Sequence, residues 1–313
     1  MRIFIFLFLF VMNIGAADDW PVLKGPYLGQ KPPGMTPEIF VPGLLNNDEM
    51  GAFCTIFSPG GTEFYFGYYK KTGDACDIYW MNQKNGRWSQ PEKLRFNSNN
   101  YENDVCMSAD GNMLVFRSWR ALPSGKKPKD HSYLWFAKRT RHGWSEAKPI
   151  LCEGIPVRTG YPSLSQNNTL YFVHRWNGRF GIYLSKFKDQ QYGKPHFVYE
   201  VFNQDFVIGD LFVSPDESYF IISGREPVEK GEFGMLDLYV IFRDSNETWS
   251  KPFSLGTEIN TCQGSENCPT VSPDGKYFFF NRYNPDKKRG NMYWVSAAVI
   301  TNIKKKATGT QME

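Results

Sequence analysis

The sequence lacks the short motifs that mark many enzyme classes. It has no Gly-x-Ser-x-Gly nucleophile elbow, no Walker phosphate-binding loop and no dinucleotide-binding fingerprint. Its 4 histidines show no metal-binding spacing such as His-Glu-x-x-His. We therefore expect no cofactor and no metal. The sequence favours a non-catalytic protein and leaves catalysis open.

Strong net charge and long apolar runs are also missing. The formal charge of the 313 residues is +4, which gives no reason to expect a nucleic-acid partner. One apolar run, residues 3–12, follows Arg2 and is shorter than the roughly 20 residues of a membrane-spanning helix. Small residues and then Asp18 come after it, as in a secretory signal peptide. The pattern predicts a signal peptide at residues 1–17, cleavage after Ala17, and a periplasmic or secreted protein without a transmembrane segment.

The residues that are abundant indicate strands and tight turns. Aromatic residues make up 17% of the chain, and there are 28 glycines and 20 prolines. Aromatic side chains pack well on a pleated sheet, and Gly and Pro form tight turns, so we expect an all-β protein. The 6 cysteines, at positions 54, 76, 106, 152, 262 and 268, can form disulfides after export. The sequence does not choose among their pairings.

The clearest pattern is a turn motif, Ser-Pro-Asp-Gly in its fullest form, that recurs before an aromatic run. Its serines are Ser58, Ser108, Ser165, Ser214 and Ser272, at spacings of 50, 57, 49 and 58 residues. A second pattern, Asp-Ile-Tyr-Trp at residues 77–80, recurs in every repeat, and a third, resembling Trp-Ser-x-Pro, follows in the first four. Each repeat therefore predicts four antiparallel strands, which is one blade of a β-propeller.

The repeats predict a single β-propeller domain at residues 18–303, with five blades of four antiparallel strands. The fifth repeat lacks its outer strand, and residues 37–43 resemble that strand in the other repeats. We therefore expect the N-terminal segment to close the ring, which removes an open sheet edge. Six blades is the alternative, if residues 20–47 supply more than one strand. Residues 304–313 are expected to form a flexible basic tail.

The Ser-Pro-Asp-Gly turn, the aromatic strand after it and the Asp-Ile-Tyr-Trp segment resemble the WD-repeat-like propeller repeats of the TolB type. The resemblance covers most of the mature chain. It implies the propeller fold but no activity, because such repeats occur in periplasmic scaffold proteins and in protease-associated domains alike. The third repeat departs most from the pattern, since its turn lacks both Pro and Gly.

Charged and aromatic residues recur beside the second strand of most repeats, and acidic residues precede the first strand of several. By analogy with other propellers, we expect them around one mouth of the central channel. They would either pair across neighbouring blades or bind a ligand through aromatic stacking and arginine. The candidates are Lys70, Glu102, Arg117, Trp119, Arg120, Arg175, Trp176, Asp210, Arg225, Glu266, Arg282 and Tyr283.

The expected function is that of an exported, non-catalytic binding or scaffold module for a protein, a peptide or an envelope glycan. The alternative is a carbohydrate-active enzyme, a glycoside hydrolase or lyase, that uses carboxylates at the channel mouth. Arginine-paired carboxylates would favour the scaffold, whereas unpaired carboxylates in an open pocket would favour the enzyme. The sequence leaves the partner and the oligomeric state open.

Overall fold

The computed structural model describes residues 20–307, apart from 47–49, 71–75, 129–130, 159, 177, 201–206, 226, 230–231, 234, 263 and 286–288. The predicted signal peptide, residues 1–17, and residues 308–313 of the predicted tail lie outside this part of the chain. Among the described residues, no helix is both long and apolar enough to cross a membrane.

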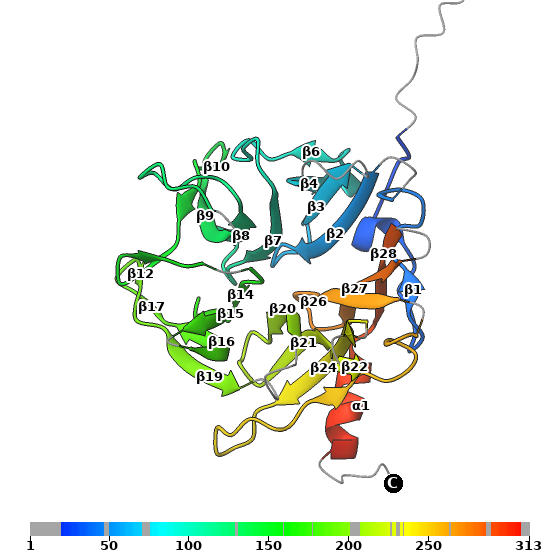
Figure 1. Ribbon diagram of the computed structural model, residues 1–313. Helices are drawn as coiled ribbons and strands as arrows, with labels where there is room; N and C mark the ends of the chain where they lie inside the picture. Colours follow the sequence, from blue (N-terminus) through cyan, green and yellow to red (C-terminus); the bar gives the residue numbers. More distant parts are fainter. Residues whose placement is uncertain are drawn as a thin grey trace, which may run out of the picture.

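Small sheets arranged around a central axis make up the fold, which confirms the β-propeller (Figure 1). The first repeat forms β2 (Met50–Phe57), β3 (Glu63–Lys70), β4 (Cys76–Lys84) and β5 (Arg87–Trp88), with β6 (Glu92–Lys93) also paired to β4. The second forms β7 (Glu102–Met107), β8 (Met113–Ser118), β9 (Tyr133–Thr140) and β10 (Gly143–Trp144), with β11 (Lys148–Pro149) paired to β9. The third forms β14 (Ser163–Leu164), β15 (Leu170–Trp176), β16 (Arg179–Ser185) and β19 (His196–Glu200).

The last two repeats complete the ring. The fourth forms β20 (Val207–Val213), β21 (Tyr219–Arg225), β24 (Asp237–Phe242) and β25 (Phe253–Ser254), and a hairpin of β22 (Pro227–Glu229) and β23 (Glu232–Phe233) follows β21. The fifth forms β26 (Ser265–Val271), β27 (Tyr277–Asn284) and β28 (Arg289–Ser296), to which β1 (Glu38–Ile39) adds.

A further four-stranded sheet corrects the expected number of blades. It consists of β13 (Ile155–Pro156), β12 (Leu151–Cys152), β18 (Gln191–Tyr192) and β17 (Phe187–Lys188), in that order. With this sheet the described residues form six blades, so the expected five differs and the alternative of six agrees. The extra strands come from two hairpins of the second and third repeats and not from residues 20–47. The sheets of the five repeats are the ones that line the central channel.

The turn serines recur because each one fixes the start of the second strand. The Ser58 hydroxyl accepts a hydrogen bond of 3.0 Å from the backbone N–H of Glu63, and the second, fourth and fifth repeats form the same bond. In the third repeat the buried Ser165 hydroxyl has no hydrogen-bond partner among the described residues. This agrees with the degenerate sequence of that turn and with the shortness of β14.

The N-terminal segment closes the ring, as expected. Strand β1 pairs antiparallel with β28, placing Glu38 opposite Trp294. The next residue, Phe40, is 1% exposed, and its ring centroid lies 5.0 Å from that of Trp294 and 5.7 Å from that of Phe64. Phe40 therefore packs between the fifth and first repeats. Similar hydrophobic clusters fill the spaces between the other neighbouring repeats.

The expected tail is partly helical. Residues 304–307 form the last turn of helix α1 (Ala298–Ala307), which follows β28 directly. The Lys304 amine lies 5.7 Å from the centre of the Phe242 ring, so the helix packs against the fourth repeat. Residues 304–307 of the expected tail therefore belong to a helix whose apolar residues Ile300 and Ile303 pack against the core.

Candidate functional site in the central channel

Each repeat contributes an equivalent residue to the central channel, four positions before its turn serine. These residues are Cys54, Asp104, Tyr161, Asp210 and Cys268. Together with the next two residues of each repeat they line a cavity of about 50 Å³. The cavity is large enough for an ion or a few water molecules. It is far smaller than the roughly 300 Å³ at which small-molecule sites begin.

Irregular backbone directs these side chains toward the axis. The antiparallel register shifts at this position in β2, β7, β20 and β26, which marks a β-bulge. Cys54, Asp104, Tyr161 and Cys268 have φ values of 49°, 51°, 60° and 52°. Such left-handed conformations are strained for residues other than glycine and cluster at functional sites. The repeated bulge therefore presents chemically reactive groups where an ordinary strand would continue.

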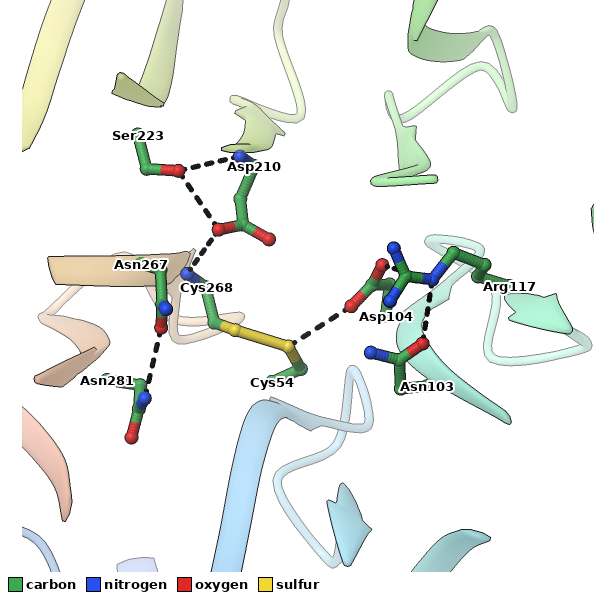
Figure 2. Close-up of a disulfide and its surroundings, with 9 residues drawn as sticks. All are labelled: Cys54, Asn103, Asp104, Arg117, Asp210, Ser223, Asn267, Cys268 and Asn281. Atoms are coloured by element: carbon green, nitrogen blue, oxygen red, sulfur yellow. Dashed lines mark hydrogen bonds and ion pairs between the residues drawn. A yellow bond between two sulfur atoms is a disulfide. The ribbon is translucent and has the colours of Figure 1, made fainter. Parts of the chain in front are cut away.

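A disulfide between Cys54 and Cys268 crosses the junction of the first and fifth repeats (Figure 2). It settles the pairing of these two cysteines, which the sequence left open. Among the described residues, the remaining cysteines are free: Cys76, Cys106, Cys152 and the exposed Cys262. Cys262 therefore does not pair with Cys268, its neighbour in the sequence.

Asp104 lies beside the Cys54 end of the disulfide and is paired with Arg117 (Figure 2). The Arg117 Nε lies 3.1 Å from Asp104 Oδ2 and donates a 2.9 Å hydrogen bond to Asn103. Gly160 makes room for this pair, because a Cβ there would lie 2.9 Å from an Arg117 nitrogen. Burial raises the pKa of Asp104, and the Arg117 charge opposes that rise.

Asp210 lies at the Cys268 end and has a different environment (Figure 2). Its Oδ2 accepts hydrogen bonds of 3.0 Å from the Ser223 hydroxyl and 3.0 Å from the Cys268 backbone N–H. Among the described residues, no lysine or arginine lies within ion-pair distance of it. Burial, together with the charge of Asp104, raises the pKa of Asp210 to about 6.

Two of the predicted mouth carboxylates, Glu102 and Glu266, are paired with arginines. Glu102 is 0% exposed and lies 3.0 Å from Arg120 Nη2. Glu266 is also 0% exposed and lies 2.7 Å from Arg282 Nε. Each of these two pairs forms within one repeat and not between neighbouring blades. The reason is local: acid and arginine come from adjacent strands of one blade or from the loop that follows them.

Among the described residues, Asp210 is the only predicted residue in the lining of the channel cavity. Arg175 is exposed and donates to the Gly178 carbonyl at 3.1 Å, and Trp176 packs against the core between the second and third repeats. Trp119 is half-buried, Tyr283 is 36% exposed, and Arg225 ends β21 opposite Val207. Lys70 ends β3, and its side chain is outside the described part.

Sequence reasoning missed Cys54, Asp104, Tyr161 and Cys268 as a set. A signal was present, because all of them stand four residues before a turn serine. Aligning the repeats on that serine places two cysteines, two aspartates and a tyrosine in one column. Only Asp210 of this column was among the predicted residues.

A second cavity lies on the outer side of the ring, between the second repeat and the small sheet of β12, β13, β17 and β18. Its volume is about 520 Å³. The lining is mostly apolar and includes Phe136, Ile150 and Leu151, of which Leu151 is 42% exposed. Lys138 and Lys148 stand at its border. We call this cavity the rim groove.

No protein-family model and no curated protein matches this chain. Solved structures do resemble it. A puromycin-hydrolyzing peptidase of Mycobacterium tuberculosis aligns with a TM-score of 0.46 and 14% identity over 79% of this chain and 35% of that one. This chain thus spans about a third of the peptidase.

A putative TolB of Agrobacterium tumefaciens aligns with a TM-score of 0.43 and 14% identity over 77% of this chain and 72% of that one. Hydrazine synthase of Kuenenia stuttgartiensis aligns with a TM-score of 0.42 and 12% identity over 80% of this chain and 81% of that one. A TolB structure is therefore among the solved structures that align with this chain. These likenesses identify neither a ligand nor an activity.

Proposed function

We propose that this protein is an exported, non-catalytic binding module that holds an apolar peptide segment of a partner protein in the rim groove. The observation that carries the proposal is the groove itself. Its volume of about 520 Å³ falls within the range of about 300 to 1,000 Å³ that is usual for ligand sites.

The lining of the rim groove favours a peptide over a glycan. Phe136, Ile150 and Leu151 offer apolar contact, and Lys138 and Lys148 offer positive charge at the border. Such a surface fits a segment with large apolar side chains next to aspartate or glutamate. Trp119 and Trp176, the aromatic residues expected to stack on a sugar or a peptide, are not part of this lining.

The state of the channel supports a non-catalytic role. Glu102 and Glu266 are fully buried and bonded to arginines, so neither is available as a general acid or base. Asp104 and Asp210 border a cavity of about 50 Å³, which is too small for a sugar ring. The arrangement that would favour a glycoside hydrolase, two free carboxylates in an open pocket, is therefore not the one these residues form.

Export remains part of the proposal, supported by the N-terminal sequence and by the Cys54–Cys268 disulfide, since disulfides persist in oxidising compartments. Mass spectrometry of the protein recovered from the periplasm or medium tests it. We expect a mature N-terminus at Asp18, or at Ala17. A protein that retains Met1 would contradict export.

The binding role is tested with random peptides displayed on phage and selected against the immobilised mature protein. We expect the selected peptides to combine large apolar residues with Asp or Glu. Their affinity, measured by fluorescence anisotropy, should fall roughly tenfold or more in Leu151→Asp and in the double variant Lys138→Glu/Lys148→Glu. All three residues are exposed, so the substitutions leave the fold intact.

Met35→Asp is the matched control, because Met35 is 46% exposed and lies outside the groove lining. Its affinity for the selected peptides should equal that of the parent protein. Peptides that bind the parent and Leu151→Asp equally well would overturn the proposal. If the protein binds fragments of envelope glycan and no peptide can be selected, the proposed peptide ligand is wrong and the ligand is a glycan.

A further inference from the structure

Three potential metal ligands meet in the channel. The Sγ atoms of Cys54 and Cys268 and a carboxylate oxygen of Asp210 all lie within 4.8 Å of one another. Asp104 stands next to them, with its Oδ1 3.3 Å from the Cys54 sulfur. Its other oxygen faces Arg117, so Oδ1 is the oxygen directed to the sulfurs. Two sulfurs and two carboxylates thus come from four different repeats.

The spacing of these atoms suits a tetrahedral metal. Zinc binds sulfur at about 2.3 Å and carboxylate oxygen at about 2.0 to 2.2 Å, which places neighbouring ligand atoms about 3.5 to 3.8 Å apart. Opening the disulfide lets the two sulfurs separate toward this spacing within a cavity of about 50 Å³. The backbone already directs Cys54 and Cys268 inward through their left-handed conformations.

Asp210 links the fourth and fifth repeats through its hydrogen bond to the Cys268 backbone N–H, but its carboxylate has no ion-pair partner among the described residues. It is 8% exposed and receives only neutral hydrogen-bond donors among the described residues. Burying a carboxylate without a cation costs stability, and an apolar or amide side chain at this position would avoid that cost. A carboxylate beside a pair of cysteines is, however, what a metal site requires.

We propose that, once the disulfide is reduced, Cys54, Cys268 and Asp210 bind one zinc-like divalent ion, with Asp104 in the fourth position. An exported dithiol reductant donates two electrons and two protons to the disulfide and becomes a disulfide itself. The ion then displaces the two thiol protons. The net charge of the channel groups is the same in both states, because two thiolates replace a neutral disulfide and the ion compensates them.

The donor set selects the class of metal. Thiolates favour thiophilic ions such as zinc, whereas calcium takes about six to eight oxygen ligands. Among the described residues, only two carboxylates border the cavity, and Arg117 already pairs with one of them. The junction of the first and fifth repeats is therefore held by the disulfide in the oxidised protein and by the bound metal ion in the reduced protein.

The test uses the full mature chain carrying Cys262→Ser, which removes the exposed thiol. The protein is reduced with a phosphine, freed of reductant, and titrated with zinc chloride, and in parallel with cobalt chloride. We expect one zinc per chain in the reduced form and none in the oxidised form. Cobalt should give the sulfur-to-metal charge-transfer absorption of a thiolate site. Bound zinc should protect Cys54 and Cys268 from alkylation, as read by peptide mass spectrometry.

Asp210→Asn keeps the disulfide, so it folds in the oxidised form and is then reduced. Its zinc affinity should be lower by roughly tenfold or more. Asp189→Asn is the matched control, because Asp189 is an exposed turn residue with a left-handed backbone conformation that asparagine also adopts. This variant should bind zinc like the parent protein. Zinc binding that is unchanged in Asp210→Asn would overturn the proposal. So would alkylation of Cys54 and Cys268 at the same rate with and without zinc, or a reduced protein that binds none.

Discussion

Cys54 and Cys268 are 214 residues apart in the sequence, and their disulfide joins the first repeat directly to the fifth. A ring of repeats must be fastened where its ends meet, because each repeat contacts only its neighbours. Here the covalent link lies at the channel, while β1 and Phe40 fasten the same junction further out.

Removing the disulfide should destabilise the whole propeller. In Cys54→Ala/Cys268→Ala, we expect the free energy of unfolding to fall by about 2 to 5 kcal/mol, because the cross-link restricts a very long loop of the unfolded chain. Urea unfolding followed by tryptophan fluorescence measures this loss. Cys262→Ala changes a free, exposed thiol and should leave the midpoint unchanged. Equal urea midpoints for the parent and both variants would contradict a stabilising role of the disulfide.

The closing strand should matter as much. Phe40→Ala removes a ring that is 1% exposed and contacts aromatic residues of both the first and fifth repeats. We expect a loss of about 3 to 5 kcal/mol. Deletion of residues 18–46 should cost more, since β1 is lost as well. Met35→Ala, in the same segment but 46% exposed, serves as the control. A Phe40→Ala protein that unfolds like the parent would show that the N-terminal segment does not hold the ring.

Much of this architecture could be predicted from the sequence, because turn serines and aromatic strands act locally and repeat. The closure by residues 37–43 followed from the missing outer strand of the fifth repeat. The small sheet of β12, β13, β17 and β18 could not be predicted in the same way. Its strands are two residues long, and β12, which follows the second repeat, pairs with β18 of the third.

The candidate site was harder to predict, since its residues meet only across the ring. Glu102 and Glu266 looked equivalent to Asp210 because each is an acid near the first strand of its repeat. Their positions relative to the β-bulge differ. Asp210 stands four residues before its turn serine and faces the channel. Glu102 and Glu266 stand six residues before their turn serines, and each pairs with an arginine of its own repeat. That difference depends on a backbone irregularity that residue types do not reveal.

The buried arginine–glutamate pairs should be structural. Arg282→Ala leaves the carboxylate of Glu266 buried without its cation and also removes a 2.8 Å hydrogen bond to the Ile259 carbonyl. We expect a loss of about 3 to 5 kcal/mol in the free energy of unfolding and no change in peptide binding at the rim groove. Arg175→Ala, at an exposed site, should stay within about 0.5 kcal/mol of the parent. Weaker peptide binding by a folded Arg282→Ala protein would contradict this and would show that the channel mouth takes part in binding.

Asp210 should make the oxidised protein less stable as the pH rises. Its pKa is raised from 3.8 to about 6 in the folded state, so between these values the folded protein binds more protons than the unfolded chain. The contribution of Asp210 to stability is therefore fully present below pH 3.8 and is lost as the pH rises through about 6. Asp210→Asn should flatten this part of the stability profile and stabilise the protein at neutral pH. Urea midpoints measured across the range, with Asp189→Asn as control, test the prediction, and an unchanged slope in Asp210→Asn would contradict it.

The repeats close into a ring whose ends meet at Cys54 and Cys268. The most direct measurement is peptide mapping of the exported protein, digested without reduction after its free thiols are blocked, and analysed by mass spectrometry. We expect a linked pair of peptides that contain Cys54 and Cys268, with the other cysteines blocked. A link from either residue to Cys262, or to any other cysteine, would place the ends of the chain elsewhere and contradict the ring described here.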